Sequence, residues 1–189
     1  SERPDPPMPG TRIEIQDLLM LDSVALETRL VAVGERGRIF LSDNGGVNWR
    51  GAVSDSDRTL TAVDAVNSER LIAVGHDSVI LLSEDSGEQW RTVYAEPEAE
   101  EPLLAVHFEL DGEGYAAGAY GRFLQSRDGG LSWEQRHPDE SDLHLGAIGR
   151  SGQSLLLAGE AGTLMRSDDG GERWRALESP YDGSFFGLL

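Results

Sequence analysis

The chain has 189 residues, of which 39% are apolar and 26% charged, and it carries a formal net charge of −18. This balance is typical of a globular protein large enough to bury a core, and the negative field disfavours binding to nucleic-acid phosphates. The absence of cysteine excludes disulfides and thiolate metal sites, and no apolar stretch approaches the roughly 20 residues of a membrane-spanning helix.

The first ten residues are rich in proline and predict an extended arm, residues 1–10, ahead of a repetitive region, residues 11–189. Each repeat contains two short apolar runs, and the second run ends at a glycine. Eight residues after that glycine, a serine opens a box of eight residues. The boxes read SDNGGVNW, SEDSGEQW, SRDGGLSW and SDDGGERW, and their serines are 41, 43 and 41 residues apart. A fixed period of this length indicates a repeat architecture.

The apolar runs are short, rich in Val, Ile, Leu and Ala, and broken by Gly, Asp, Asn and Ser, which predicts strands and not helices. In the second repeat we expect strands at 59–65, 70–75, 78–83 and 88–94. Four antiparallel strands per repeat predict an all-β fold, a β-propeller with four-stranded antiparallel blades. The blades are expected at about 16–54, 55–97, 98–139 and 140–180, and residues 181–189 are expected to open a fifth.

Four blades and one strand do not close a ring, and an open sheet edge is a liability for a β protein. The sequence therefore predicts either a partial propeller or a ring completed by pairing of two copies. Residues 11–15, TRIEI, are expected to complete the outer edge of a last blade.

Each box falls between the third and fourth strands of its blade, where the chain reverses. A glycine there can take the positive φ of a turn, the serine and the Asp or Asn can accept turn N–H groups, and the tryptophan can pack between blades. We expect this structural role for Ser42, Asn44, Gly46, Trp49, Ser83, Asp85, Gly87, Trp90, Ser126, Asp128, Gly130, Trp133, Ser167, Asp169, Gly171 and Trp174. None of the boxes continues into the alternating oxygen ligands of a calcium-binding loop, so no metal site is expected.

The boxes resemble the Asp-box, or bacterial neuraminidase repeat, Ser-x-Asp-x-Gly-x-x-Trp, with Asn44 replacing the aspartate in the first copy. The segments VAVGERGRIFLSDNGGVNW and AAGAYGRFLQSRDGGLSW are most similar to repeats of the photosystem II assembly factor family and its bacterial relatives. This resemblance implies a seven-bladed, non-enzymatic protein outside the cytoplasm, in the bacterial periplasm or secreted. It also implies a scaffold that binds a protein partner during assembly or stabilisation of a membrane-associated or envelope complex.

Asp-boxes also occur in sialidases, so a glycoside hydrolase of the sialidase type is the alternative. That family carries a Phe/Tyr-Arg-Ile-Pro motif near its N-terminus, whereas this chain has GTRIEI. No motif pairs a glutamate with any of the tyrosines, Tyr94, Tyr115, Tyr120 and Tyr181, and the four histidines show no metal-ligand spacing. We therefore expect no catalytic residue, no cofactor and no metal.

Function on a rigid scaffold usually lies in loops, which here gather at the end opposite the boxes. Arginine and tyrosine are favoured in interfaces, so the candidate partner-binding residues are Arg36, Arg38, Tyr120 and Arg122. The acidic runs at 95–102 and 137–142 are expected to be solvated loops. They favour a basic protein partner over a chlorophyll protein. We expect neither nucleic-acid binding nor membrane insertion, and a homodimer that completes the propeller remains an alternative.

Overall fold

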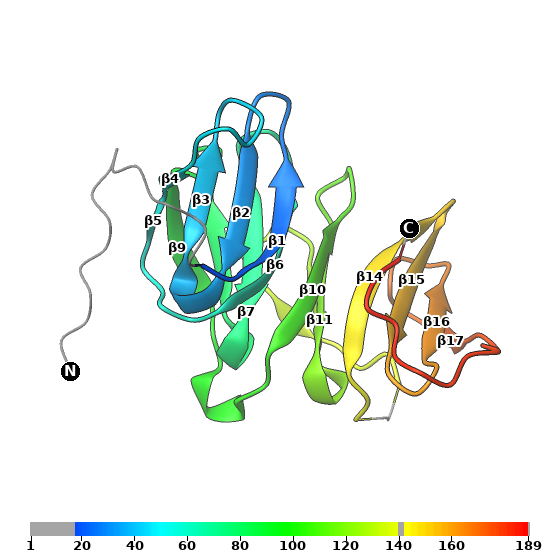
Figure 1. Ribbon diagram of the computed structural model, residues 1–189. Coiled ribbons are helices and arrows are strands. Elements are labelled where there is room, and N and C mark those ends of the chain that lie inside the picture. Colours follow the sequence, from blue (N-terminus) through cyan, green and yellow to red (C-terminus); the bar gives the residue numbers. More distant parts are fainter. Residues whose placement is uncertain (1–17, 140–141, 189) are drawn as a thin grey trace.

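The computed structural model describes residues 18–139 and 142–188 and shows four antiparallel β-sheets in succession along the chain (Figure 1). The first blade comprises β1 (Met20–Ala25), β2 (Leu30–Gly34), β3 (Ile39–Ser42) and β4 (Arg50–Gly51). The second comprises β6 (Leu60–Ala65), β7 (Leu71–Gly75), β8 (Ile80–Ser83) and β9 (Gln89–Tyr94), with β5 (Val53–Ser54) added at its edge. The third comprises β10 (Leu103–Phe108), β11 (Gly114–Gly118), β12 (Phe123–Ser126) and β13 (Glu134–Gln135). The fourth comprises β14 (Leu145–Ser151), β15 (Ser154–Gly159), β16 (Leu164–Ser167) and β17 (Arg175–Ala176).

Each blade is a meander in which neighbouring strands in the chain are neighbours in the sheet. The first strands β1, β6, β10 and β14 contact one another in that order, so they form the inner side of a curved row of blades. Short 3₁₀ turns follow the second strand in the first three blades: η2 (Glu35–Gly37), η3 (His76–Ser78) and η5 (Ala119–Gly121). A fourth turn, η4 (Pro97–Ala99), lies between the second and third blades. The all-β propeller expected from the repeat is confirmed.

The second blade shows how closely the repeat predicts the strands. Its four antiparallel strands begin and end within two residues of the expected ranges. The additional strand β5 was not expected: it pairs in parallel with β9, with Val53 opposite Gln89 and Ser54 opposite Trp90. The segment that leaves the first blade therefore adds a short strand to the outer edge of the second. The carboxylate of Asp55 reinforces this pairing by accepting the backbone N–H of Thr92 at 3.0 Å.

Three apolar clusters lie between successive blades, because alternate residues of each strand face opposite neighbours. The tryptophan of a box packs against the preceding blade. Trp90 lies with Val31 and Leu41 of the first blade, and the ring of Trp174 meets that of Phe123 in the third blade at 5.5 Å. The box thus joins a turn to the inter-blade core, and this contact orients each sheet on the one before it.

Residues 181–188 form no regular strand, although they occupy the place where a next blade would begin. Gly162 donates its N–H to the carbonyl of Gly183 at 2.8 Å, as Gly121 donates to Leu143 at 2.9 Å one blade earlier. The N–H of Phe185 is bonded to the carbonyl of Gly159 at 2.9 Å. The expected arm at residues 1–10 and the TRIEI segment lie outside the described residues. Within the described ranges no helix is long and apolar enough to cross a membrane.

Candidate functional site

The Asp-box turn of the second blade shows the local chemistry of the repeat. The hydroxyl of Ser83 accepts the N–H of Gly87 at 2.9 Å and donates to the carboxylate of Asp85 at 2.9 Å. That carboxylate also accepts the N–H of Gln89 at 2.9 Å, and the indole of Trp90 donates to the carbonyl of Gly87 at 2.8 Å. Every polar atom that the motif supplies is therefore engaged inside the turn.

The other three boxes repeat this hydrogen bonding, including the one that departs from the motif. Asn44 accepts the N–H of Asn48 through its amide oxygen at 2.9 Å, as the aspartates of the other boxes do. The neutral amide thus supplies the acceptor without the charge. Among the residues that the structure describes, no group of three or more His, Cys, Asp or Glu side chains could hold a metal ion.

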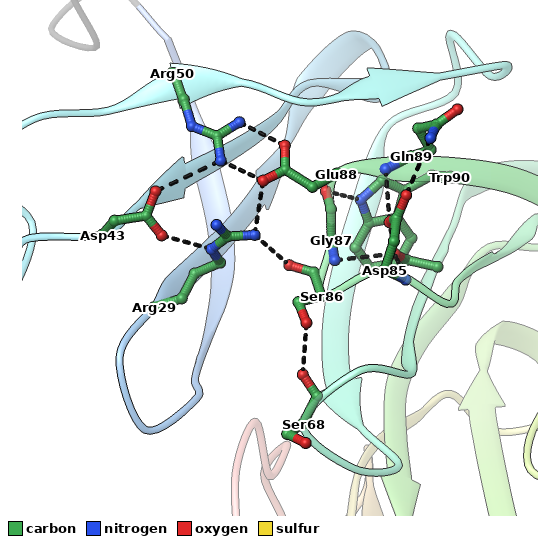
Figure 2. A network of polar contacts seen from close by, with 11 residues as sticks. Arg29, Asp43, Arg50, Ser68, Asp85, Ser86, Gly87, Glu88, Gln89 and Trp90 are labelled. Carbon is green, nitrogen blue, oxygen red and sulfur yellow. Dashed lines mark hydrogen bonds and ion pairs between the residues drawn. The ribbon is translucent and has the colours of Figure 1, made fainter.

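Charged side chains join the turn of the second box to the first blade (Figure 2). The Arg29 guanidinium contacts Asp43 at 2.6 Å and Glu88 at 2.9 Å, and it donates to the Ser86 carbonyl at 3.0 Å. Arg50 forms a bidentate pair with Glu88, with one bond of 2.6 Å. The hydrogen bond from Arg50 lowers the pKa of the Glu88 carboxyl, and that from Arg29 lowers the pKa of Asp43. We call Arg29, Asp43, Arg50 and Glu88 the inter-blade staple.

The opposite end, which we call the loop end, carries the turns η2, η3 and η5 and the connections between blades. It holds all of the candidate partner-binding residues but presents them differently. Arg36 and Tyr120 are exposed and occupy corresponding positions with φ of 58° and 54°. Arg38 is half-buried. Arg122 is only 5% exposed, so its side chain is not available to a partner at this surface.

Arg122 instead holds the acidic connection between the second and third blades. Its guanidinium pairs with Glu96 at 2.5 Å and Glu101 at 3.5 Å, and it donates to the Tyr94 hydroxyl at 2.9 Å and to Gln135 at 3.0 Å. The hydrogen bond from Tyr94 and the charge of Arg122 lower the pKa of Glu96. The run is a loop whose Glu98 and Glu100 are exposed, as expected, but Glu96 and Glu101 fold back onto a buried cation.

Two tyrosines are paired with glutamates, which the sequence did not indicate. The Tyr94 hydroxyl donates to Glu96, and the Tyr115 hydroxyl donates to Glu113 at 2.9 Å. Burial, reinforced by the neighbouring glutamate, raises the pKa of Tyr94 to about 12, and the same causes raise the pKa of Tyr115. With a raised pKa neither hydroxyl is ionised at neutral pH, so a nucleophilic role would depend on the paired glutamate acting as a base.

A half-buried carboxylate on the inner strands is also structural. The two oxygens of Asp64 accept the backbone N–H groups of Ala65 and of Phe108 in the next blade, each at 2.8 Å. Burial raises the pKa of this carboxyl, and the neighbouring Asp22 acts in the same direction. Because both oxygens are occupied by backbone donors, Asp64 links two blades and is poorly placed to transfer a proton to a substrate.

The repeated sheets and the four turns define an Asp-box β-propeller chain. Residues 91–180 match the model of a family described as photosynthesis system II assembly factor YCF48. The photosystem II assembly lipoprotein Ycf48 of Synechococcus sp. (strain CC9902) is 35% identical over 83 residues, which are 42% of this chain and 25% of that protein. The resemblance to the photosystem II assembly factor family is confirmed. The matched segment spans 25% of the length of this relative.

Solved structures share the fold at low sequence identity. YCF48 bound to a D1 peptide has a TM-score of 0.66 at 18% identity, covering 84% of this chain and 54% of that one. YCF48 from Cyanidioschyzon merolae also has a TM-score of 0.66, at 14% identity, covering 87% and 58%. An ancestral GH74 enzyme has a TM-score of 0.73 at 17% identity, covering 86% and 24%. These likenesses establish the propeller architecture alone.

Proposed function

We propose that the chain is a non-enzymatic propeller scaffold that binds a protein partner and assists the assembly or stability of a membrane-associated or envelope complex. The observation that carries this proposal is the match of residues 91–180 to the YCF48 assembly-factor family. A solved YCF48 is bound to a D1 peptide, and the Synechococcus relative is a lipoprotein. We further propose that the chain acts outside the cytoplasm, and the lipoprotein relative supports this location.

The loop end is the proposed partner-binding surface. Arg36 and Arg38 contribute cations there and Tyr120 contributes an exposed ring, whereas Arg122 supports the surface from beneath. At the box end, which carries the four Asp-box turns, the hydroxyl of each box serine accepts a backbone N–H within its turn. A contact surface at the loop end therefore leaves the turns that hold the fold undisturbed.

Affinity capture from a membrane extract of the source organism, with the captured protein identified by mass spectrometry, tests this proposal. The variant Arg36→Glu combined with Arg38→Glu reverses two charges at the loop end and should reduce capture. The matched control reverses Arg173, which lies in the fourth box, and Arg175, which follows it, both of them exposed. Equal capture by both double variants would exclude the two arginines as contact residues.

The Tyr94 and Glu96 pair is the observation that keeps a glycoside hydrolase as a second candidate, because sialidases use a tyrosine with an acidic partner. Turnover of fluorogenic sialosides and other glycosides is the direct measurement. We expect none, because Glu96 is held by Arg122, and the hydrogen bond from Tyr94 and the charge of Arg122 lower the pKa of Glu96 and make it a weak base. Turnover that disappears in Tyr94→Phe would replace the scaffold proposal with an enzymatic one.

A further inference from the structure

One continuous strip of the loop end runs across the third and fourth blades. Besides the bonds of Gly121 to Leu143 and of Gly162 to Gly183, the N–H of Glu160 donates to the His144 carbonyl at 3.0 Å. The N–H of His144 returns a bond to the Glu160 carboxylate at 2.9 Å. These contacts join four separate segments into one surface. We call Tyr120, His144, Glu160 and Tyr181 the aromatic strip.

Two exposed tyrosine rings mark the ends of the strip. Tyr120 is 57% exposed, and its ring meets that of His144 edge to face at 4.8 Å. It holds a left-handed backbone, with φ of 54°, which is unfavourable for a bulky side chain. Arg36, Asp77 and Ala161 hold the same backbone in the other blades, so the surroundings that fix it belong to the repeat. The structure thus presents an aromatic ring to solvent at a position of the repeat where a smaller side chain would be less strained.

Tyr181, which is 54% exposed, is also held in place. Its N–H bonds to the hydroxyl of Ser179 at 3.1 Å, and its ring lies 5.4 Å from that of Phe185. A Cβ added at Gly183 would lie 2.2 Å from the Tyr181 hydroxyl oxygen, so the ring folds over that glycine. Both tyrosines are therefore ordered, exposed aromatic surfaces.

The charges that the strip presents are negative. Asp142 and Asp182 are exposed on its segments, and Glu160 is half-buried between them. Arg122 follows the η5 turn directly, but its charge is buried and paired with Glu96 and Glu101. These carboxylates would repel an anionic ligand. An apolar ligand would remove water from the carboxylates without offering hydrogen bonds in its place.

We propose that the aromatic strip binds an arginine- or lysine-bearing segment of the protein partner. A guanidinium or ammonium can lie over a tyrosine face while carboxylates beside it receive its hydrogen bonds. This inference rests on the proposed scaffold function and specifies the chemistry of its partner. It assigns recognition to Tyr120 and Tyr181, with Asp182 as the acidic neighbour.

Calorimetric titration of the chain with an acetylated and amidated peptide of alternating glycine and arginine tests the inference. Tyr120→Asn suits a left-handed backbone, and with Tyr181→Ala it keeps the net charge, so nonspecific attraction to the acidic protein is unchanged. We expect each variant to weaken binding about tenfold. Leu110→Ala, at a fully exposed apolar residue of the box end, should leave binding unaltered. Unchanged affinity in both tyrosine variants overturns the inference.

A charge-matched pair separates local recognition from the overall field. Asp182→Asn and Glu27→Gln each remove one exposed negative charge, the second in the β1 to β2 hairpin at the box end. We expect Asp182→Asn to weaken peptide binding at least threefold more than Glu27→Gln, and equal effects contradict the strip. The capture experiment is independent: a captured partner whose binding ignores Tyr120 and Tyr181 refutes the strip and leaves the scaffold function standing. Peptide binding at the strip without any captured partner argues against the scaffold function.

Discussion

At the scale of single residues, the glycine that ends the second strand of each blade has a steric role. Gly75 has a φ of −172°, an extended backbone that any residue can adopt, so its conformation does not require glycine. An added Cβ would nevertheless lie 2.1 Å from the carbonyl oxygen of Thr59, and Gly34, Gly118 and Gly159 show the same approach to the residue just before their own first strands. The glycine is required because two backbones meet there.

Gly75→Ala should therefore lower the free energy of unfolding by about 3 kcal/mol, because main-chain atoms have to move to accept the methyl group. Urea unfolding followed by tryptophan fluorescence measures the change. Gly187→Ala is the matched control, since an added Cβ at that position meets no atom within 4 Å. Similar stability losses in both variants would contradict the close-approach explanation.

The residues also show where sequence reasoning succeeds and where it stops. The serine, acid, glycine and tryptophan of a box act within one turn, so their spacing predicts both the turn and the blade. Arg122 was expected at the surface with Arg36, because both stand in equivalent short loops. Its burial depends on Tyr94 of the second blade and on Glu101 of the connection between the second and third blades. Contacts between blades depend on how the blades are placed in space, so no local sequence pattern predicts them.

At the scale of elements, the inter-blade staple joins the first and second blades with a definite pH dependence. The folded pKa of Glu88 is lowered from its ordinary value of 4.5, so its stabilising contribution is present above that pH and is lost as the pH falls through the folded pKa. Glu88→Gln should cost about 1 kcal/mol at neutral pH, a modest value because the pair is partly solvated. Urea unfolding at a series of pH values should show this difference shrinking in acid. A difference independent of pH would contradict the assignment, and Glu27→Gln controls for the lost charge.

The acidic connection at 95–102 is a second element whose order depends on a single side chain. Arg122→Met removes the cation that Glu96 and Glu101 share, so their like charges would repel and the connection should loosen. A protease that cuts after glutamate should then cleave within 96–101 several times faster, with sites mapped by mass spectrometry. Arg38→Met, the same change at the equivalent position of the first blade, should leave that rate unaltered. Equal protection in both variants would show that Arg122 does not hold the connection.

At the scale of the whole molecule, the row of blades has two outward sheet faces on which no described blade packs. On the first blade, Met20, Ala32, Phe40 and Trp49 line a cavity of about 110 Å³. Trp49 corresponds to Trp90, which at the next interface packs against a preceding blade. The repeat thus leaves a sheet face on which another sheet can pack, and either further blades or a second copy would cover it.

Met20 and Trp49 are half-buried at this cavity, whereas Ala32 and Phe40 are buried. Because a partly exposed tryptophan beside an apolar cavity favours association, we expect the isolated 189-residue chain to form dimers or larger species as its concentration rises. Light scattering coupled to size-exclusion chromatography measures the mass directly. Trp49→Glu places a charge in the proposed contact and should shift the population toward monomer, whereas Leu110→Glu, at an exposed residue of the box end, should not. A monomer at every concentration would rule out pairing of two copies and leave further blades as the means of covering these faces. A dimer that persists in Trp49→Glu would place the contact elsewhere on the molecule.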